Sequence, residues 1–402
     1  MPSPRPTDDG GLDIRPFRAV RYAVSDTGDL SRVICPPYDV QDAARAQAPR
    51  HRPHHLSRLL YARPGEAAQQ LARWLERGVL VREERPALYV YEQHSEGARL
   101  QRGVIGELDL LGDRVPVLPH EGVRERVVAQ RAAHMAGVRA QLEPLLLGYR
   151  APGPAPTALL DRIASGRPLV TAKDGEVTHS LWACADPVEQ DAITAHLARG
   201  HALIADGHHR RAACLQLNTQ QPDGPWRRTL ALLVDQATHP LEVAAVHRVV
   251  PSLDAEKSAR AAAEVARVEP LPRGPRPPRP GEIVIAGGGS AWSVTDPQPA
   301  PLARALAGRP DAWRALPVAV ADHLLIEHTW SVPGLPGTIH HVHDITLATT
   351  SVAPPGHGVA VLLPAVAERT VRALADAGDL MPRKTTSFGP KPVAGLVLRI
   401  PE

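Results

Sequence analysis

The chain has 402 residues, too many for one compact core, so two or three folded units are expected. Hydrophobic residues make up 43% of the sequence, enough for well-buried interiors, although it contains 42 prolines and only 3% aromatic residues. The formal net charge is +3 and the arginines are scattered, so the sequence lacks the basic field of a nucleic-acid-binding protein.

The number of cysteines and the length of the apolar runs indicate the cellular compartment. Cys35, Cys184 and Cys214 lie far apart, and their odd number favours a reducing environment over a disulfide framework. Every apolar run falls short of the roughly 20 residues that cross a bilayer. Residues 1–11 are polar and lack the apolar stretch of a secretory signal. We therefore expect a cytoplasmic protein that does not contact a membrane.

Hydrophobic periodicity and turn residues predict the elements of the first half of the chain. They are strand pieces over 14–20 and 32–35, a rigid proline turn over 36–40, a helix over 67–78, paired strands over 87–92 and 103–109, and a helix over 126–142. In the first of these helices Leu71, Trp74 and Leu75 share one face, and Gly78 suits a C-cap.

The second half alternates strands and helices irregularly. We expect strands over 201–205, 229–234 and 243–250, a helix from His209, strands over 282–286 and 291–295, helical segments near 302–306, 318–326 and 364–377, a polar loop over 381–392 and a final strand over 395–400. Residues 270–280 repeat Pro, Arg and Gly, which predicts an exposed loop or linker. The pattern predicts a multi-domain α+β (mixed α/β) fold.

The run from Asp206 to Arg210, between an apolar strand and a helix, is the predicted centre of the active or binding site. Gly207 permits a sharp turn, and the start of the helix offers free N–H groups that favour an anion. Asp206 can hold a cation or accept a proton, while His208 and His209 can donate to a phosphate and Arg210 can clamp an oxyanion. The alternative is a polar helix start with a capping Asp206, but five functional residues in a row favour a site.

A second cluster combines His120 and Glu121 with Arg124. A carboxylate beside a histidine and an arginine can serve as a general base for a hydroxyl group. The alternative has equal weight, because a glutamate near a helix N-terminus is favoured by the helix dipole alone.

A third cluster is the loop from Lys384 to Lys391, which also contains Thr385, Thr386 and Ser387. Two lysines and three hydroxyl groups in a constrained loop suit a phosphate or a carboxylate. The alternative is a solvated loop.

Short motifs in a fixed order extend along nearly the whole chain. They are Pro16-Phe-Arg-Ala19, Pro36-Pro-Tyr-Asp-Val40, Trp74-Leu75 with Gly78-Val-Leu80, Pro86-Ala-Leu-Tyr-Val-Tyr91, His120-Glu121, Ile204-Ala-Asp-Gly-His-His-Arg210, His247-Arg248, Met381-Pro-Arg-Lys-Thr-Thr386 and Pro390-Lys391. This set resembles the bacterial DUF1015 family, whose members have no defined function and are often encoded beside serine-biosynthesis genes.

The Asp-Gly-His-His-Arg run also resembles the ligand loop of the ParB/sulfiredoxin superfamily, which includes nucleotide-hydrolysing DNA-partition proteins and kinases that phosphorylate free serine. This second resemblance covers only the central part of the chain. With it we expect an N-terminal α+β domain over 1–112, a central ParB-like domain over 113–252 and a C-terminal α+β domain over 253–402.

In those serine kinases an Asp-Gly-His run helps to bind nucleotide phosphates and a metal, and a glutamate activates the hydroxyl group. The resemblance therefore implies roles for matching residues, and chemistry adds others. Expected catalytic residues are Asp206, His208, His209 and Glu121; phosphate- or nucleotide-binding residues are Gly207, Arg210, Lys384, Thr385, Thr386 and Lys391; substrate-binding residues are His120, Arg124, His247, Arg248, Tyr38 and Asp39; and Asp206 is the expected Mg²⁺ ligand.

The resulting hypothesis is a phosphotransferase that uses Mg²⁺ and ATP or ADP to phosphorylate the hydroxyl group of a small amino acid such as free serine. The alternative is a regulatory protein that binds a nucleotide or a phosphorylated metabolite, as a ParB-like switch does, without kinase activity. The expected partners are a small-molecule substrate and a nucleotide, while a homo-oligomer is left open. Nucleic acid is disfavoured by the net charge of +3. The hypothesis assumes that the loops at Asp206 and at Lys384–Lys391 meet in space.

Overall fold

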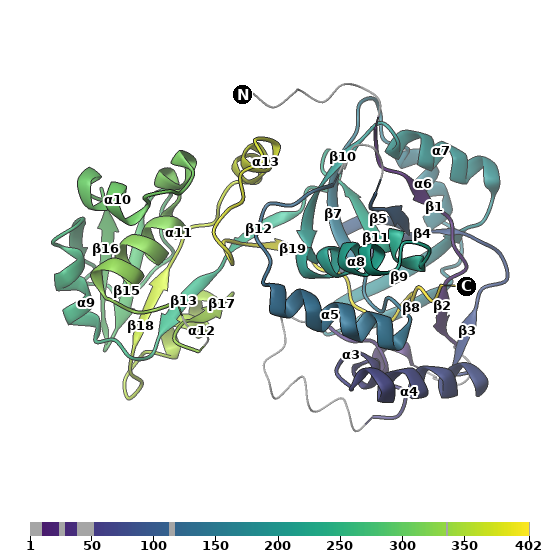
Figure 1. The fold of residues 1–402 in the computed structure, drawn as a ribbon, viewed down its shortest axis with the longest axis horizontal. Helices are drawn as coiled ribbons and strands as arrows, with labels where there is room; N and C mark the ends of the chain where they lie inside the picture. The colour runs from purple at the N-terminus through teal and green to yellow at the C-terminus, as the bar shows by residue number, and fades with distance from the viewer. Residues whose placement is uncertain (1–9, 24–28, 38–51, 112–116, 335–336, 402) are drawn as a thin grey trace. The chain divides into compact units, whose positions relative to one another are not determined.

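The computed structural model describes residues 10–23, 29–37, 52–111, 117–334 and 337–401 (Figure 1). The chain divides into two compact units. Unit 1 comprises Met1–Pro119, Val123–Leu241 and Pro390–Glu402, and unit 2 comprises His120–Gly122 and Glu242–Gly389. Both units mix helices and strands, so the predicted α+β class is confirmed. Among the described residues, no helix combines the length and the apolar character that a membrane crossing requires.

Unit 1 is built on one large mixed sheet. Its strands are β1 (Ile14–Arg15), β4 (Leu88–Ser95), β5 (Ala98–Asp109), β6 (Val117–Leu118), β7 (Leu145–Arg150), β8 (Val170–Asp174), β9 (Val177–Cys184), β10 (His201–Asp206) and β11 (Arg228–Asp235). They lie in the order β6-β10-β7-β11-β5-β4-β9-β8, with β1 beside β5. Strand β11 is buried along almost its whole length, as its continuous apolar run predicts. A separate ribbon pairs β2 (Val20–Tyr22) with β3 (Leu80–Arg82).

Helices and the C-terminal segment cover this sheet. The helical elements of unit 1 are η1 (Leu30–Arg32), α3 (Ser57–Leu60), α4 (Pro64–Glu76), α5 (Glu125–Val138), α6 (Thr157–Ala164), α7 (Pro187–Leu197), α8 (His208–Gln220) and η4 (Pro225–Arg227). Leu160 of α6 and Ile193 of α7 pack on the face of β4 and β5 that presents Val90 and Val104. Helices α5 and α8 pack together in a second apolar cluster. Side chains of the other β4–β5 face contact the backbone of residues 390–391.

Unit 2 contains a six-stranded antiparallel sheet among its described residues, in the order β14-β16-β15-β18-β13-β17, and a ribbon of β12 with β19. The strands are β12 (Glu242–Ala245), β13 (His247–Val250), β14 (Arg267–Pro270), β15 (Ile283–Gly287), β16 (Ser290–Thr295), β17 (His340–Val342), β18 (Val359–Leu362) and β19 (Thr386–Gly389). The helical elements are α9 (Ala255–Ala262), α10 (Pro299–Ala305), η5 (Asp311–Ala315), α11 (Pro317–Ala319), the π-helix η6 (Val320–Thr329), α12 (Ile345–Thr350) and α13 (Glu368–Asp376). Its core joins β13, β15, β16 and β18 to α12.

The division into units differs from the three predicted domains. Strand β5 lies in the first predicted domain and β11 in the second, yet the two are paired over six residue pairs of one sheet. Residues 390–402 belong to unit 1 rather than to a C-terminal domain. Sheet pairing between distant segments is not encoded in a local motif, and the predicted boundaries rested on the resemblance of one central motif.

Several predicted elements change in detail. The strand expected over 243–250 is two strands, β12 and β13, which pair with different neighbours. The loop expected over 381–392 contains β19, and residues 395–400 make isolated bridges instead of a strand. The segment before Cys35 is the 3₁₀ helix η1, because the Asp29 side chain accepts the Ser31 N–H and caps it.

Candidate functional site

The turn from β10 to α8 has a backbone that only glycine adopts readily. Gly207 is the N-cap of α8 and has a φ of 101°, in the left-handed region. A Cβ atom at this position would lie 2.6 Å from Cδ2 of Leu145, so a larger residue would also clash. No side chain among the described residues caps the start of α8. The N–H groups of its first turn therefore provide the electropositive helix end that the sequence predicted.

Asp206 stands directly before this turn and contacts two cationic side chains. Its Oδ1 lies 3.2 Å from Nζ of Lys391, and its Oδ2 accepts a hydrogen bond from Nη2 of Arg210. Burial by itself would raise the pKa of Asp206, but the charges of Arg210, Lys391 and His208 outweigh it and lower the pKa to about 2. Asp206 is therefore a permanent anion at neutral pH. Lys391, from the loop predicted by sequence, does meet the Asp206 run within unit 1.

Arg210 is held as firmly as the carboxylate that it contacts. Its Nη1 donates to the carbonyl oxygen of Pro144 at 2.6 Å, and the same nitrogen lies 4.0 Å from Oε2 of Glu143. The pairing with Asp206 spans one helical turn, from residue i to i+4. This geometry makes Arg210 a brace for Asp206.

His209 links the start of α8 to the start of α5. Its Nε2 accepts a hydrogen bond of 3.1 Å from the backbone N–H of Arg124, the N-cap of α5. A ring nitrogen that accepts a hydrogen bond carries no proton, so this contact requires the Nδ1-protonated neutral ring. His208 precedes it in the first turn of α8, and its charge helps to lower the pKa of Asp206.

Two buried glutamines hold the backbone that carries Lys391. Nε2 of Gln101 donates to the carbonyl oxygen of Pro390 at 2.8 Å, and Nε2 of Gln93 donates to that of Lys391 at 3.2 Å. The same Gln93 nitrogen lies 3.2 Å from Oε1 of Gln101. Both side chains are almost fully buried. Sequence reasoning missed them, because both lie in the polar stretch between the strands predicted over 87–92 and 103–109.

The His120–Glu121 pair belongs to unit 2. Nε2 of the buried His120 lies 2.9 Å from Oγ1 of Thr386. Burial raises the pKa of Glu121, and its carboxylate accepts the backbone N–H of Lys384. That hydrogen bond and the charges of Lys384, Arg248 and Arg383 oppose the shift without cancelling it. A carboxylate with a raised pKa is a stronger base than an ordinary carboxylate.

Arg248 positions the loop of Lys384. It is completely buried, and its Nε and Nη2 each lie 2.8 Å from an oxygen of Asp322 in a bidentate pair. Its η nitrogens also donate to the carbonyl oxygens of Val246, Arg383 and Lys384. These contacts use all five N–H donors. Asp322 was not anticipated from the sequence.

The remaining residues of this group are also held by the protein. Nδ1 of His247 accepts the backbone N–H of Leu363 at 3.1 Å, and burial lowers the pKa of His247 to about 4, so its ring is neutral. The Thr385 hydroxyl donates to the carbonyl oxygen of Pro382. Lys384 has a φ of 58°, a left-handed conformation that is uncommon for residues other than glycine.

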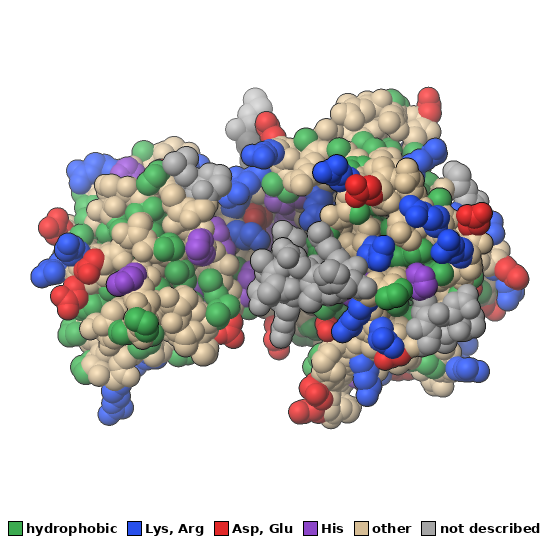
Figure 2. Space-filling view, turned by 90° about the horizontal axis from the view of Figure 1, so that it is seen from below, with side chains coloured by type: hydrophobic (Ala, Val, Ile, Leu, Met, Phe, Trp, Pro, Cys, Tyr) green, Lys and Arg blue, Asp and Glu red, His purple; other side chains and the backbone are tan. Residues whose placement is uncertain are grey.

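The predicted site residues thus fall into two groups. Unit 1 holds Arg124, Asp206, Gly207, His208, His209, Arg210 and Lys391, and unit 2 holds His120, Glu121, His247, Arg248, Lys384, Thr385 and Thr386. Tyr38 and Asp39 lie outside the described residues. Figure 2 shows Lys and Arg side chains interspersed with Asp and Glu on the visible face of each unit, in keeping with the scattered charges of the sequence.

The donor set at Asp206 bears on the expected Mg²⁺. Within the described part of the chain, no group of three or more His, Cys, Asp or Glu side chains converges as a metal site. A lone carboxylate still fits Mg²⁺, because this ion keeps several waters and is often held by one or two carboxylates together with substrate phosphates. The low pKa of Asp206 keeps it in the ionised form that such an ion needs.

The fold and the site define a class of protein. It is a mixed α+β protein in which a turn between a strand and a helix favours an anion. The chain belongs to the DUF1015 family, described as a protein of unknown function, whose model matches residues 14–319. The predicted family membership is confirmed. No curated protein matches the sequence.

Three solved structures resemble the chain at low identity. Free serine kinase in complex with AMP is 15% identical with a TM-score of 0.40, covering 71% of this chain and 87% of that one. A conserved hypothetical protein from Pyrococcus furiosus is 15% identical with a TM-score of 0.39, covering 73% and 94%. C-terminally truncated SbnI from Staphylococcus aureus is 10% identical with a TM-score of 0.40, covering 74% and 87%.

Proposed function

We propose that this protein is a phosphotransferase that uses Mg²⁺ and ATP or ADP to phosphorylate the hydroxyl group of a small amino acid such as free serine. The observation that carries the proposal is the arrangement at the start of α8. A permanently ionised Asp206 lies there 3.2 Å from the Lys391 ammonium group, next to the N–H groups of a helix start. Phosphoryl transfer depends mainly on positioning and on neutralising phosphate charge, and these groups supply both.

Unit 1 takes the nucleotide in this proposal. The phosphates lie against the first turn of α8, where His208 and the helix dipole favour negative charge. Lys391 contributes a point charge, and Asp206 would hold the cation of the nucleotide–Mg²⁺ complex. A bound Mg²⁺ would neutralise charge that develops on the phosphate oxygens.

Glu121 is the general base in this proposal. Glu121 accepts the proton of the substrate hydroxyl group while the hydroxyl oxygen forms a bond to the terminal phosphorus. The bond from that phosphorus to its bridging oxygen breaks, and the electron pair leaves with the nucleoside diphosphate or monophosphate. The raised pKa of Glu121 suits this task, because it makes the carboxylate a stronger base.

The test is phosphoserine formation from L-serine, Mg²⁺ and ATP or ADP, followed by ³¹P NMR. We expect a product that requires the nucleotide, and a loss of about a hundredfold or more in Asp206→Asn, because one preorganised electrostatic contact contributes on that order. Asp191→Asn on the exposed side of α7 is the matched control and should retain full activity. Unchanged turnover in Asp206→Asn would show that the assigned site is wrong.

A regulatory protein without turnover is the second candidate function, and the braced contacts of Arg210 and Arg248 favour it, because residues held this firmly also suit static binding. It predicts that ATP, ADP or phosphoserine raises the melting temperature by mass action. In that case no phosphoserine would form from any pairing of nucleotide and hydroxy amino acid.

A further inference from the structure

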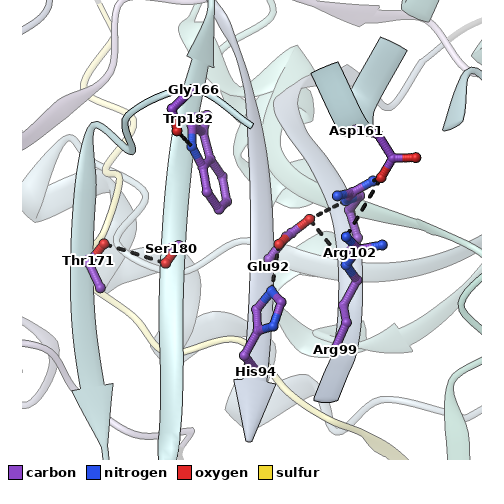
Figure 3. Close-up of polar contacts among 9 residues, drawn as sticks. All are labelled: Glu92, His94, Arg99, Arg102, Asp161, Gly166, Thr171, Ser180 and Trp182. Carbon is purple, nitrogen blue, oxygen red and sulfur yellow. Dashed lines mark hydrogen bonds and ion pairs between the residues drawn. The ribbon is translucent and has the colours of Figure 1, made fainter. Parts of the chain in front are cut away.

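Unit 1 contains a cavity of about 640 Å³ that is separate from the site at Asp206. Successive side chains of a strand point to opposite faces of its sheet. Gln93 and Gln101 face the segment that carries Lys391, so their neighbours Glu92 and Arg102 face the other way, toward α6, where they line the cavity (Figure 3).

The pairing of β4 with β9 orders the cavity wall in layers. His94 is opposite Thr178, Glu92 is opposite Ser180, and Trp182 lies one step further inward. The Trp182 ring is 8% exposed, and its indole N–H donates to the carbonyl oxygen of Gly166 at 2.9 Å. The wall therefore changes from polar to aromatic with depth.

The outer rim is acidic. Glu96 at the β4–β5 turn and Glu176 at the β8–β9 turn both line the cavity, and both are exposed. The two hairpin ends lie side by side because Ser95 pairs with Val177. A positively charged group at the mouth of the cavity would thus meet two carboxylates.

A β-bulge places a second arginine in the cavity. Gln93 pairs with Gln101 but His94 pairs with Arg99, so Leu100 is the extra residue of β5. In a regular strand Arg99 would point to the face opposite that of Arg102, whereas the bulge brings both guanidinium groups to one face. Figure 3 shows the two side chains converging beside Glu92. Bulges of this kind re-aim side chains next to functional sites.

The charged side chains that line the cavity differ in burial. The Glu92 and Arg102 side chains are only 4% and 3% exposed, and Glu92 also lies 2.6 Å from Nε2 of His94 and 3.3 Å from Nε of Arg99. Burial on this scale requires pairing, and the Glu92–Arg102 pair provides it.

Asp161 is the second carboxylate on the arginines, but its side chain is 58% exposed on α6. It contacts Nη1 of Arg102 and lies 3.6 Å from Nη2 of Arg99. Because the Asp161 side chain is itself exposed, it can turn into solvent, and an incoming carboxylate can take its place on both guanidinium groups.

We propose that this cavity binds a small free α-amino acid. Its carboxylate lies on Arg99 and Arg102, its ammonium group faces the rim of Glu96 and Glu176, and its side chain points toward Trp182. The arginines and the acidic rim carry opposite charges, so together they match a zwitterion. A simple carboxylate would contact only the arginines, and a simple amine only the rim. The inference does not depend on the proposed phosphotransferase activity, because none of these residues belongs to the site at Asp206.

Isothermal titration calorimetry of the full chain with each of the twenty protein L-amino acids tests this inference, with acetate and ethylamine as half-ligands. We expect at least one amino acid to bind. Acetate and ethylamine should each bind with an affinity at least about tenfold lower than that of this amino acid. Arg99→Gln should weaken the amino acid about tenfold or more, because it removes charge-assisted hydrogen bonds. Arg162→Gln is the matched control on α6, since Arg162 is 64% exposed and does not line the cavity, and it should leave the affinity unchanged.

Two further variants separate this cavity from the site at Asp206. Asp206→Asn should keep the amino-acid affinity that depends on Arg99, and Ser165→Trp, which fills the cavity from its exposed wall, should abolish that Arg99-dependent binding without lowering the melting temperature. Loss of binding in Asp206→Asn together with retention in Arg99→Gln would assign the amino acid to the Asp206 site and overturn the inference. Absence of saturable binding across the whole panel would also overturn it.

Discussion

Asp206 in unit 1 and Glu121 in unit 2 are both partly buried carboxylates beside a lysine-bearing loop, yet their pKa values shift in opposite directions. Asp206 contacts the ammonium group of Lys391 and the guanidinium group of Arg210 directly, and these charges outweigh burial. Glu121 accepts one backbone N–H, and the charges of Lys384, Arg248 and Arg383 do not outweigh its burial. The balance between burial and the nearby cations therefore decides the sign of each shift.

The difference divides the chemistry between the two groups. Carboxyl groups whose environments drive their pKa values apart are suited to different tasks in a reaction. Asp206 keeps its charge over the whole physiological range and can only orient or balance other charges. Glu121 can gain and lose a proton. The following variants would break or sharpen this contrast.

The largest effect is expected for Glu121→Gln. The amide keeps the shape but cannot accept a proton, so kcat for phosphoserine formation should fall by about a hundredfold or more. Nucleotide affinity, assigned to unit 1, should stay the same. Kinetic assays and calorimetry of nucleotide binding measure the two quantities, with Glu242→Gln on the exposed start of β12 as the control. A loss of nucleotide affinity with normal kcat would reverse the assignment of the two units.

An intermediate effect is expected for Gln101→Leu. The carbonyl oxygen of Pro390 would lose its donor inside the protein, which costs about 1–3 kcal/mol of stability. Because Lys391 follows directly, nucleotide affinity should also fall, by about threefold to tenfold.

The control for this variant is Gln190→Leu. Gln190 likewise donates to backbone carbonyl oxygens in unit 1, those of Pro86 and Cys184, but does not contact the Lys391 segment. It should lower stability without changing nucleotide affinity. Equal affinity losses in both variants would mean that Gln101 has no special positioning role. Urea unfolding and calorimetry provide the two readouts.

The smallest effect concerns the neutral histidine of unit 2. The pKa of His247 is lowered by burial to about 4 in the folded chain, against an ordinary value near 6.5. Between these values the unfolded chain binds more protons, so stability falls as the pH drops through 6.5 and stops falling below about 4. The contribution between pH 7 and pH 6 is about 0.7 kcal/mol.

His247→Gln tests this contribution, because an amide oxygen can still accept the Leu363 N–H but does not titrate in this range. Urea unfolding of this variant should show a loss of stability from pH 7 to pH 6 that is smaller by about that amount. An identical pH dependence in the wild type and the variant would show that His247 is not kept neutral.

Local patterns in the sequence were sufficient for the elements at the centre of unit 1. The apolar run ending at Asp206 and the helix after Gly207 were predicted correctly, since a strand, a glycine turn and a helix are encoded by neighbouring residues. The bracing of Arg210 by Pro144 and of Arg248 by Asp322 could not be foreseen. Such contacts join residues far apart in the chain.

The β-bulge at Leu100 could not be predicted from the sequence, for a related reason. Periodicity assigns Arg99 and Arg102 to opposite faces, and only the pairing with β4 reveals the extra residue. The strand expected over 395–400 failed because these residues make single bridges to two separate segments instead of one ladder. Apolar composition predicts burial there correctly, but it does not identify a neighbour.

The membership of residues 390–402 in unit 1 has a consequence for how the protein is made. Val20 pairs with Leu398, and Cys35 pairs with Ala394, so residues of unit 1 that precede unit 2 in the chain find partners among residues made after it. Contacts that close such long loops form slowly. The unit whose synthesis begins first is completed last, and until then its edges near Val20 and Cys35 are open to chaperones and to mispairing.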